Sequence, residues 1–261
     1  MTAALRWEWV RITTVRSTRI CLALALLLGA GLGYLGSNPT YDTYDDSGFP
    51  VGEPTVDWYG AFGFPLLLMV VLASVVAAQA IGQEYRFGLI RLTLTAFPQR
   101  GRILAAKVAL VVGASVLIAL LSYLGSWIGV ALHGFPTPPA NVVAPDSTFF
   151  LRGVVFVVLW ALSAFALAGI TRQTAIGIAI PIISGLIVEN ILATLLSDRA
   201  SWLVDVLPWS TAARWASTAP ELEPGTTLDI PPVGWAALGV FAVWVAVLMV
   251  GQALAFVRRD A

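Results

Sequence analysis

"LVVGASVLIALLSYLGSWIGVAL", residues 110–132, is a long apolar run that indicates the fold class of this chain. No residue in this stretch carries a charge. An α-helix rises about 1.5 Å per residue, so a run of this length crosses the roughly 30 Å hydrocarbon core of a bilayer. A surface helix of a soluble domain would show polar residues along one face at a period of about 3.6 residues, and this run has no such face. The stretch therefore predicts a transmembrane helix.

The rest of the chain repeats this pattern. It is 58% hydrophobic and only 11% charged, which is the composition of a membrane protein. We expect an all-α integral membrane protein that forms a single transmembrane domain over residues 1–261. Its six predicted transmembrane helices cover residues 20–36, 61–81, 104–131, 150–170, 174–196 and 232–257.

The positive charges predict the orientation of these helices. Lys and Arg remain on the cytoplasmic side of short loops. Twelve of the fifteen lie on one side of the predicted spans: Arg6, Arg11, Arg16, Arg19, Arg86, Arg91, Arg100, Arg102, Lys107, Arg172, Arg258 and Arg259. The opposite side holds eleven carboxylates, with Arg199, Arg214 and, at a span edge, Arg152. We therefore expect both termini in the cytoplasm.

The first predicted span also has features of a signal peptide. Its run "LALALLLGAGLG" ends in small residues, as a cleavage site does. However, nineteen residues precede this span, which begins at Ile20, and an uncleaved span keeps the charge alternation intact through all six helices. We expect the span to be retained.

Motifs of a self-sufficient enzyme are missing from the sequence. There is no G-x-x-x-x-G-K-[ST] phosphate loop, and the connection at 197–231 is too short to fold an ATPase domain. His133 is the single histidine and Cys21 the single cysteine, which excludes most zinc and iron sites and any intrachain disulfide. We therefore expect no catalytic residue, no metal site and no cofactor in this chain, and a hydrogen-bonded loop histidine at His133.

One loop combines charge with apolar stripes. The stretch "GQEYRFGLIRLTLTAFPQRGRILAAK", residues 82–107, carries five of the fifteen positive charges. At helical spacing, one stripe consists of Phe87, Ile90 and Leu94, and an adjacent one of Tyr85, Leu89 and Leu92. The pattern predicts a short cytoplasmic helix that ends at Pro98. Gly88 weakens it by up to about 1 kcal/mol, which predicts either a close approach or a bend. An ordinary positive-inside loop would explain the charges but not the stripes.

The same stretch resembles the second cytoplasmic loop of ABC-2 type transporter permeases. The shared residues are Glu84, Tyr85, Arg86 and Gly88, followed by Arg91, Leu92, Leu94, Pro98, Arg100, Arg102 and Lys107. The six spans, the wide outer loop before the last one and the basic tail fit the same family.

The resemblance implies a role for this loop. Residues 82–103 would form a coupling helix that docks on a separate ABC ATP-binding subunit. The candidate coupling residues are Glu84, Tyr85, Arg86, Gly88 and Arg91. That partner would bind ATP and Mg²⁺. Two copies of each subunit would assemble in the lipids of a bacterial cell membrane. No nucleic acid partner is expected.

The resemblance further implies that residues 1–19 form an interfacial helix on the inner leaflet. Leu5, Trp9 and Ile12 share one face of such a helix, but Arg16 falls on that face too. A disordered arm is the alternative.

Glu189 and Asn190 are candidate pathway residues in the fifth span. An ionisable residue within a span costs up to about 3 kcal/mol and should face protein or water. Pro181 and Gly185 precede Glu189 by eight and four residues, so the three share one face. Glu189 would either line a pathway between permease chains or act as a hydrogen-bonded packing residue.

The outer segment at 197–231 interleaves tryptophans with polar residues and Pro208. Its tryptophans, Trp202, Trp209 and Trp215, suit a membrane surface. Either the segment is a surface loop or it re-enters the membrane, as the matching region of related permeases does.

From all of these features the sequence predicts the permease subunit of an ABC exporter for a hydrophobic or amphiphilic compound. Two alternatives stay open: a membrane-embedded structural or regulatory subunit, and an enzyme that modifies membrane lipids. ATPase stimulation would separate the exporter from the structural subunit, and grouped acid and base side chains near one interface would favour the enzyme.

Overall fold

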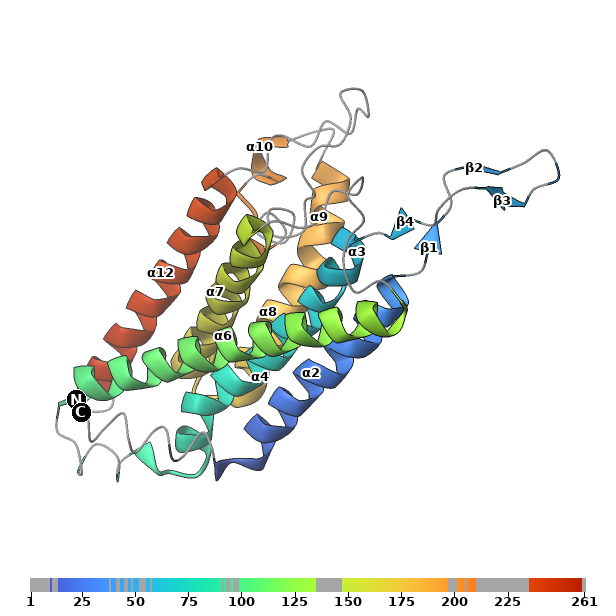
Figure 1. Ribbon diagram of the computed structural model, residues 1–261. Helices are drawn as coiled ribbons and strands as arrows, with labels where there is room; N and C mark the ends of the chain where they lie inside the picture. The colour runs from blue at the N-terminus through green and yellow to red at the C-terminus, as the bar shows by residue number, and fades with distance from the viewer. Residues whose placement is uncertain are drawn as a thin grey trace.

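The computed structural model describes most of the chain. The described residues are 10, 14–37, 39–40, 43–44, 47, 49–51, 55–56, 58–90, 92, 95, 99–134, 147–196, 201–204, 206–209 and 235–259. Within them, six helical segments are long and apolar enough to cross a membrane, which confirms the six predicted spans (Figure 1). They are α2 (Arg16–Gly36), α3 (Trp58–Gly63) with α4 (Pro65–Arg86), α6 (Arg100–Leu132), α7 (Ser147–Thr171), α8 (Thr174–Ile183) continued by the π-helix η1 (Ser184–Val188) and α9 (Glu189–Leu196), and α12 (Trp235–Arg259).

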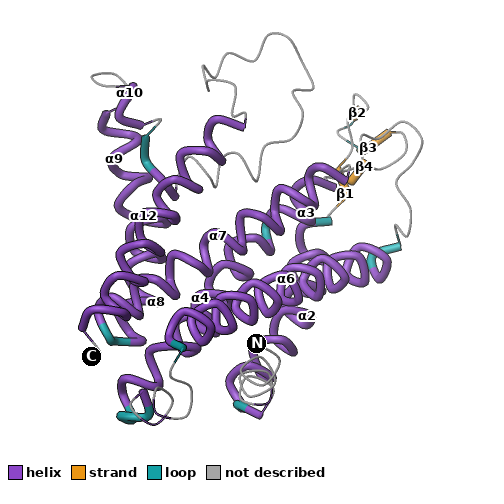
Figure 2. Tube along the Cα trace, turned by 90° about the vertical axis from the view of Figure 1, so that its left-hand side faces the viewer, coloured by secondary structure: helices purple, strands orange, loops and turns teal. Residues whose placement is uncertain are grey.

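Helices α4 and α7 form the centre of the bundle. They are the most buried of the spans, and α7 packs against α4, α6, α8 and α12 (Figures 1 and 2). Large side chains fill the space between them, including Trp160, Phe165 and Met69, none of which reaches the surface. The apolar runs of the sequence thus supply both the lipid-facing surface and a close-packed interior.

On one flank of this core, α2 and α6 pack backbone to backbone. Gly29 and Gly33 of α2 lie against the main chain of Ser122 and Ser126 of α6. The Ser126 hydroxyl donates to the carbonyl oxygens of Ser122 at 3.1 Å and of Gly29 at 3.4 Å. Small residues at a four-residue spacing are what allow transmembrane helices to approach this closely.

Short strands follow the first span, which the sequence analysis did not predict. Strand β1 (Pro39–Thr40) pairs with β4 (Thr55–Val56), and β2 (Thr43–Tyr44) pairs with β3 (Pro50–Val51), both antiparallel. Figure 1 shows them projecting away from the bundle beyond the end of α2. The spanning part of the fold is helical, as expected.

At the opposite end of the bundle lie the start of α2, the end of α4, the start of α6 and the end of α12 (Figure 1). Arg16, Arg86 and Arg100 belong to these helix ends, and Arg172 lies in the tight turn between α7 and α8. We call this the basic end. Of the predicted interfacial segment 1–19, only Val10 and residues 14–19 are described, so that prediction falls largely outside the described residues.

Candidate functional site

An elbow at the basic end joins α4 to α6. Helix α4 ends at Arg86, and α6 begins at Arg100. Between them Ile90, Leu92 and Thr95 have helical backbone. The helix expected over 82–103 is not continuous, because residues 82–86 belong to α4, residues 87–89 form a turn and residues 100–103 belong to α6. Arg91, Leu94 and Pro98 lie outside the described residues.

Gly88 terminates α4 and turns the chain into the elbow. Its φ is +67°, a left-handed conformation that glycine adopts without the penalty of a β-carbon. Its amide donates to the carbonyl oxygen of Tyr85 at 3.2 Å, and that of Phe87 donates to Gln83 at 3.0 Å. A β-carbon on Gly88 would meet no described residue of this chain within 4 Å. Of the two expectations for this glycine, the bend is confirmed, and a close approach by a partner stays a prediction.

The outward side of the elbow is apolar. Phe87, Leu89 and Leu92 have 65%, 46% and 67% of their surface exposed, whereas Ile90 is buried. The guanidinium of Arg86, itself exposed, lies over the Phe87 ring at 5.6 Å. We call Arg86, Phe87, Leu89 and Leu92 the elbow surface. Phe87 comes from one predicted stripe, and Leu89 and Leu92 come from the other. The turn at Gly88 interrupts the helical periodicity and brings both stripes to the same side.

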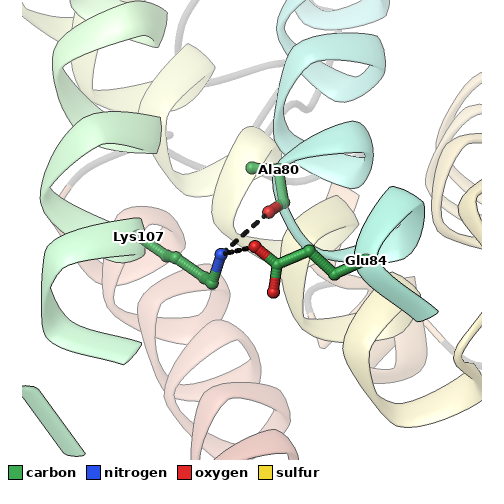
Figure 3. A network of polar contacts seen from close by, with 3 residues as sticks. All are labelled: Ala80, Glu84 and Lys107. Carbon is green, nitrogen blue, oxygen red and sulfur yellow. Dashed lines mark hydrogen bonds and ion pairs between the residues drawn. The ribbon is translucent and has the colours of Figure 1, made fainter. Parts of the chain in front are cut away.

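Glu84 does not belong to the elbow surface. Its side chain is buried and forms an ion pair with Lys107 of α6 (Figure 3). The Lys107 ammonium also donates to the carbonyl oxygen of Ala80 at 3.4 Å. The sequence analysis placed Lys107 among the loop charges. It lies inside the bundle instead, because α6 begins at Arg100 and carries Lys107 two turns into the packed core.

Tyr85 connects α4 to the turn between α7 and α8. Its half-buried ring lies 5.3 Å from the guanidinium carbon of Arg172. Arg172 is left-handed, with a φ of 58°. Gly82, one turn earlier on α4, is so close to Thr174 at the start of α8 that no β-carbon would fit. Nothing in the sequence signalled either contact, because both join segments far apart along the chain.

Glu189 and Asn190, the predicted pathway residues, point to different environments. Glu189 is buried, together with Pro181 and Gly185, so the shared face predicted for these three residues is confirmed. Asn190 is exposed, and its amide donates to the carbonyl oxygens of Gly185 at 3.2 Å and Leu186 at 3.0 Å.

A π-helix immediately precedes this pair, and the sequence analysis missed it. Such turns widen the helix locally and often occur at functional sites. Pro181, which cannot donate a backbone hydrogen bond, lies one turn before η1 and was the available signal.

Trp209, in the outer segment, reaches the interior of the bundle. Its side chain fills the space beside Gly185, where a β-carbon would collide with both Trp209 and Trp160. The rings of Trp160 and Trp209 lie 6.3 Å apart. Both Trp160 and Gly185 are near the middle of their spans, so Trp209 lies at a similar depth. Trp209 thus packs into the bundle, whereas most of the segment 197–231 lies outside the described residues, so its re-entry into the membrane stays a prediction.

His133 ends α6 at the other end of the bundle. Its ring stacks on Tyr34 with centroids 4.5 Å apart, and Nδ1 lies 3.3 Å from the Ser37 hydroxyl and 3.2 Å from the Tyr34 carbonyl oxygen. The histidine is hydrogen-bonded, as predicted.

The fold and this site define a class of protein: a six-span helical membrane protein with an apolar, arginine-bearing elbow between its second and third spans. Residues 12–188 match the profile of a family described as ABC-2 family transporter protein. Because the match covers more than half of the chain, the chain belongs to this family, which confirms the resemblance seen in the sequence. The matched residues include the elbow and end just before Glu189. A search of curated proteins finds no match.

The chain is therefore a multi-pass transmembrane transport component. Membership of this family implies association with an ABC ATP-binding subunit.

Proposed function

We propose that this chain is the membrane subunit of a two-component ABC exporter. In this role it couples ATP hydrolysis by a separate subunit to the outward movement of a hydrophobic or amphiphilic compound. The elbow surface is the observation that carries the proposal. Phe87, Leu89 and Leu92 expose large apolar side chains at a turn beyond the spans, next to Arg86. Such a cluster is stabilised when an amphipathic segment enters an apolar groove of a partner.

The distribution of charge supports the orientation that this role needs. The basic end carries most of the chain's arginines, and Lys and Arg are retained in the cytoplasm. The elbow then faces the compartment that holds ATP, and both termini are cytoplasmic. We further propose that the partner binds ATP and Mg²⁺ and that two copies of each subunit assemble in a bacterial cell membrane.

The five candidate coupling residues divide by their position. Arg86 and Gly88 are exposed and shape the elbow surface, and we propose that Arg91 contributes to it as well. Tyr85 and Glu84 lie behind this surface, so they act by positioning the elbow rather than by touching the partner.

A purification tests the proposed function. The tagged chain is extracted from its native membrane in mild detergent, its companions are identified, and ATP hydrolysis is assayed with and without it. We expect a stoichiometric ATP-binding protein whose hydrolysis rate rises in the complex. Leu92→Ser should reduce both binding and stimulation, because it removes an exposed apolar contact, whereas Thr95→Ser removes only a methyl group from the same segment and should change neither. A chain that purifies without a nucleotide-binding companion would refute the proposal.

For Glu189 we propose a role in the transport pathway. It is a buried carboxylate within a span, directly after a π-helix. Both features are typical of functional positions in membrane helices. Glu189→Gln should alter transport or substrate range while leaving partner binding intact, and unchanged transport and range would assign the residue to packing.

A further inference from the structure

The last two turns of α4 are tied to three other parts of the bundle. Gln79 accepts a hydrogen bond from Ser17 of α2 at 2.5 Å. Gly82 lies against Thr174 of α8, and Tyr85 lies under Arg172. The fourth tie, to α6, is the ion pair of Glu84 with Lys107 described above.

This ion pair occupies a special place relative to the elbow. Glu84 lies in the final turn of α4, the helix that enters the elbow, and Lys107 lies two turns into α6, the helix that leaves it. The two residues are 23 positions apart, and the pair closes the loop that contains the elbow. Figure 3 shows the Lys107 ammonium reaching across to α4, where it meets both the carboxylate and the Ala80 carbonyl.

Stability alone does not account for a pair at this depth. Removing two charges from water costs several kcal/mol per ion, and a packed apolar pair of similar volume is often as stable or more stable. An ion pair with an added backbone hydrogen bond is directional, so it fixes the position of one helix along the other. Contacts between apolar side chains are not directional and allow the helices to slide. Ile103, Ala106 and Val111, which flank Lys107 on α6, are buried apolar residues whose side chains form no directional bond across to α4.

We propose that Glu84 and Lys107 are positioning residues that hold α4 and α6 in a single register. The elbow and its two helices then move as one rigid unit. The role of this rigid unit in transmitting movement from a partner to the spans rests on the proposed function. The register itself is a property of this chain alone and is measurable without the partner.

The decisive variant replaces the charged pair by an apolar one. E84L/K107M keeps the approximate volumes and leaves no buried charge without its counterion, unlike either single change. E84K/K107E reverses the pair and keeps the link. Each is made in a Cys21→Ala background, because Cys21 is the single native cysteine.

Spin labels report the register. Nitroxides at Leu67→Cys and Ala105→Cys occupy exposed positions on α4 and α6. Leu67 lies seventeen residues before Glu84, about 25 Å along the helix axis, so the distance between the labels changes if α4 slides or rotates. A second pair at Leu27→Cys and Ala105→Cys spans α2 and α6, which pack through glycines, and serves as the control.

In the parent protein and in E84K/K107E we expect one narrow distance distribution for the α4–α6 label pair. In E84L/K107M we expect its width at least to double, while the control pair stays unchanged. In the complex, stimulation of the partner's ATPase should fall several-fold in E84L/K107M and recover in E84K/K107E, with the amount of bound partner unaltered.

An unchanged α4–α6 distribution in E84L/K107M, with normal stimulation, would overturn the inference and leave the proposed function standing. If E84L/K107M does not fold, E84K/K107E decides alone: a narrow distribution supports the link and a broad one refutes it. The absence of any ATP-binding companion would remove the proposed function without affecting the distance result.

Discussion

Gly129 of α6 lies directly against Ala30 of α2, with no room for a β-carbon between its Cα and the Ala30 carbonyl oxygen. One turn earlier, Gly125 has the same relationship to Leu26. The two helices therefore meet through their main chains. Because lipid is as apolar as the side chains, close packing of this kind is what holds membrane helices together.

The first prediction follows from this contact. Gly129→Ala should lower the midpoint of thermal unfolding in detergent, because the new methyl group forces α2 and α6 apart at a cost of about 1–3 kcal/mol. Gly113→Ala is the matched control. It lies on the same helix, and a β-carbon there would meet no described residue within 4 Å. Alanine's better helix propensity should leave stability equal or higher. Equal effects of the two changes would contradict the close packing.

The second prediction concerns the turn into the elbow. Gly88→Ala should destabilise the turn by about 1–2 kcal/mol, because alanine resists the left-handed conformation although space is available. Gly88→Asn should be tolerated better, since asparagine adopts this conformation more readily. Limited proteolysis of the elbow measures the effect. Gly101→Ala is the control. Gly101 lies in α6 on the other side of the elbow, its β-carbon would meet no described residue within 4 Å, and the variant should behave like the parent protein.

The contrast between these glycines shows what the sequence could predict. The length of an apolar run is a local signal, so it located all six spans, and the apolar stripes indicated helical backbone in the elbow. The bend at Gly88 was also predictable, because glycine in a helical pattern is a local irregularity.

Contacts between distant segments were not predictable in this way. Lys107 reads as one more positive charge near a span end, and only the packing of α6 against α4 reveals that it is buried against Glu84. Likewise, the composition of the outer segment was consistent with both a surface loop and re-entry. The position of Trp209 beside Gly185 depends on how Trp160 of α7 and Gly185 of the fifth span pack together.

The third prediction addresses Arg172, which adopts a left-handed conformation without being glycine. Arg172→Ala keeps the backbone penalty of roughly 1 kcal/mol and loses the contact with the Tyr85 ring. Arg172→Gly loses the same contact but removes the penalty of the left-handed backbone conformation. The glycine variant should therefore unfold at a higher temperature than the alanine variant by an amount equivalent to about 1 kcal/mol. Identical midpoints would mean that the turn relaxes when the arginine side chain is removed.

The fourth prediction tests whether the Trp209 side chain packs against Gly185. Gly185→Ala should lower the unfolding midpoint, because its methyl group would collide with the ring of Trp160 and with Cβ and Cγ of Trp209. Trp209→Leu should also be destabilising, because removing part of a packed ring leaves a cavity. Leucine keeps Cβ and Cγ, but without the packed indole ring residue 209 is free to shift away from the new methyl group. In the double variant the combined loss should therefore be less than the sum of the two single losses by about 0.5–3 kcal/mol.

The matched control for this cycle is Trp202→Leu. Trp202 lies in the same outer segment but is exposed, so its effect should simply add to that of Gly185→Ala. Coupling with Trp209 and additivity with Trp202 would together locate the segment inside the bundle at the depth of Gly185. Additive effects at both tryptophans would favour the surface-loop interpretation, because only a side chain in contact with residue 185 can compensate for a methyl group added there.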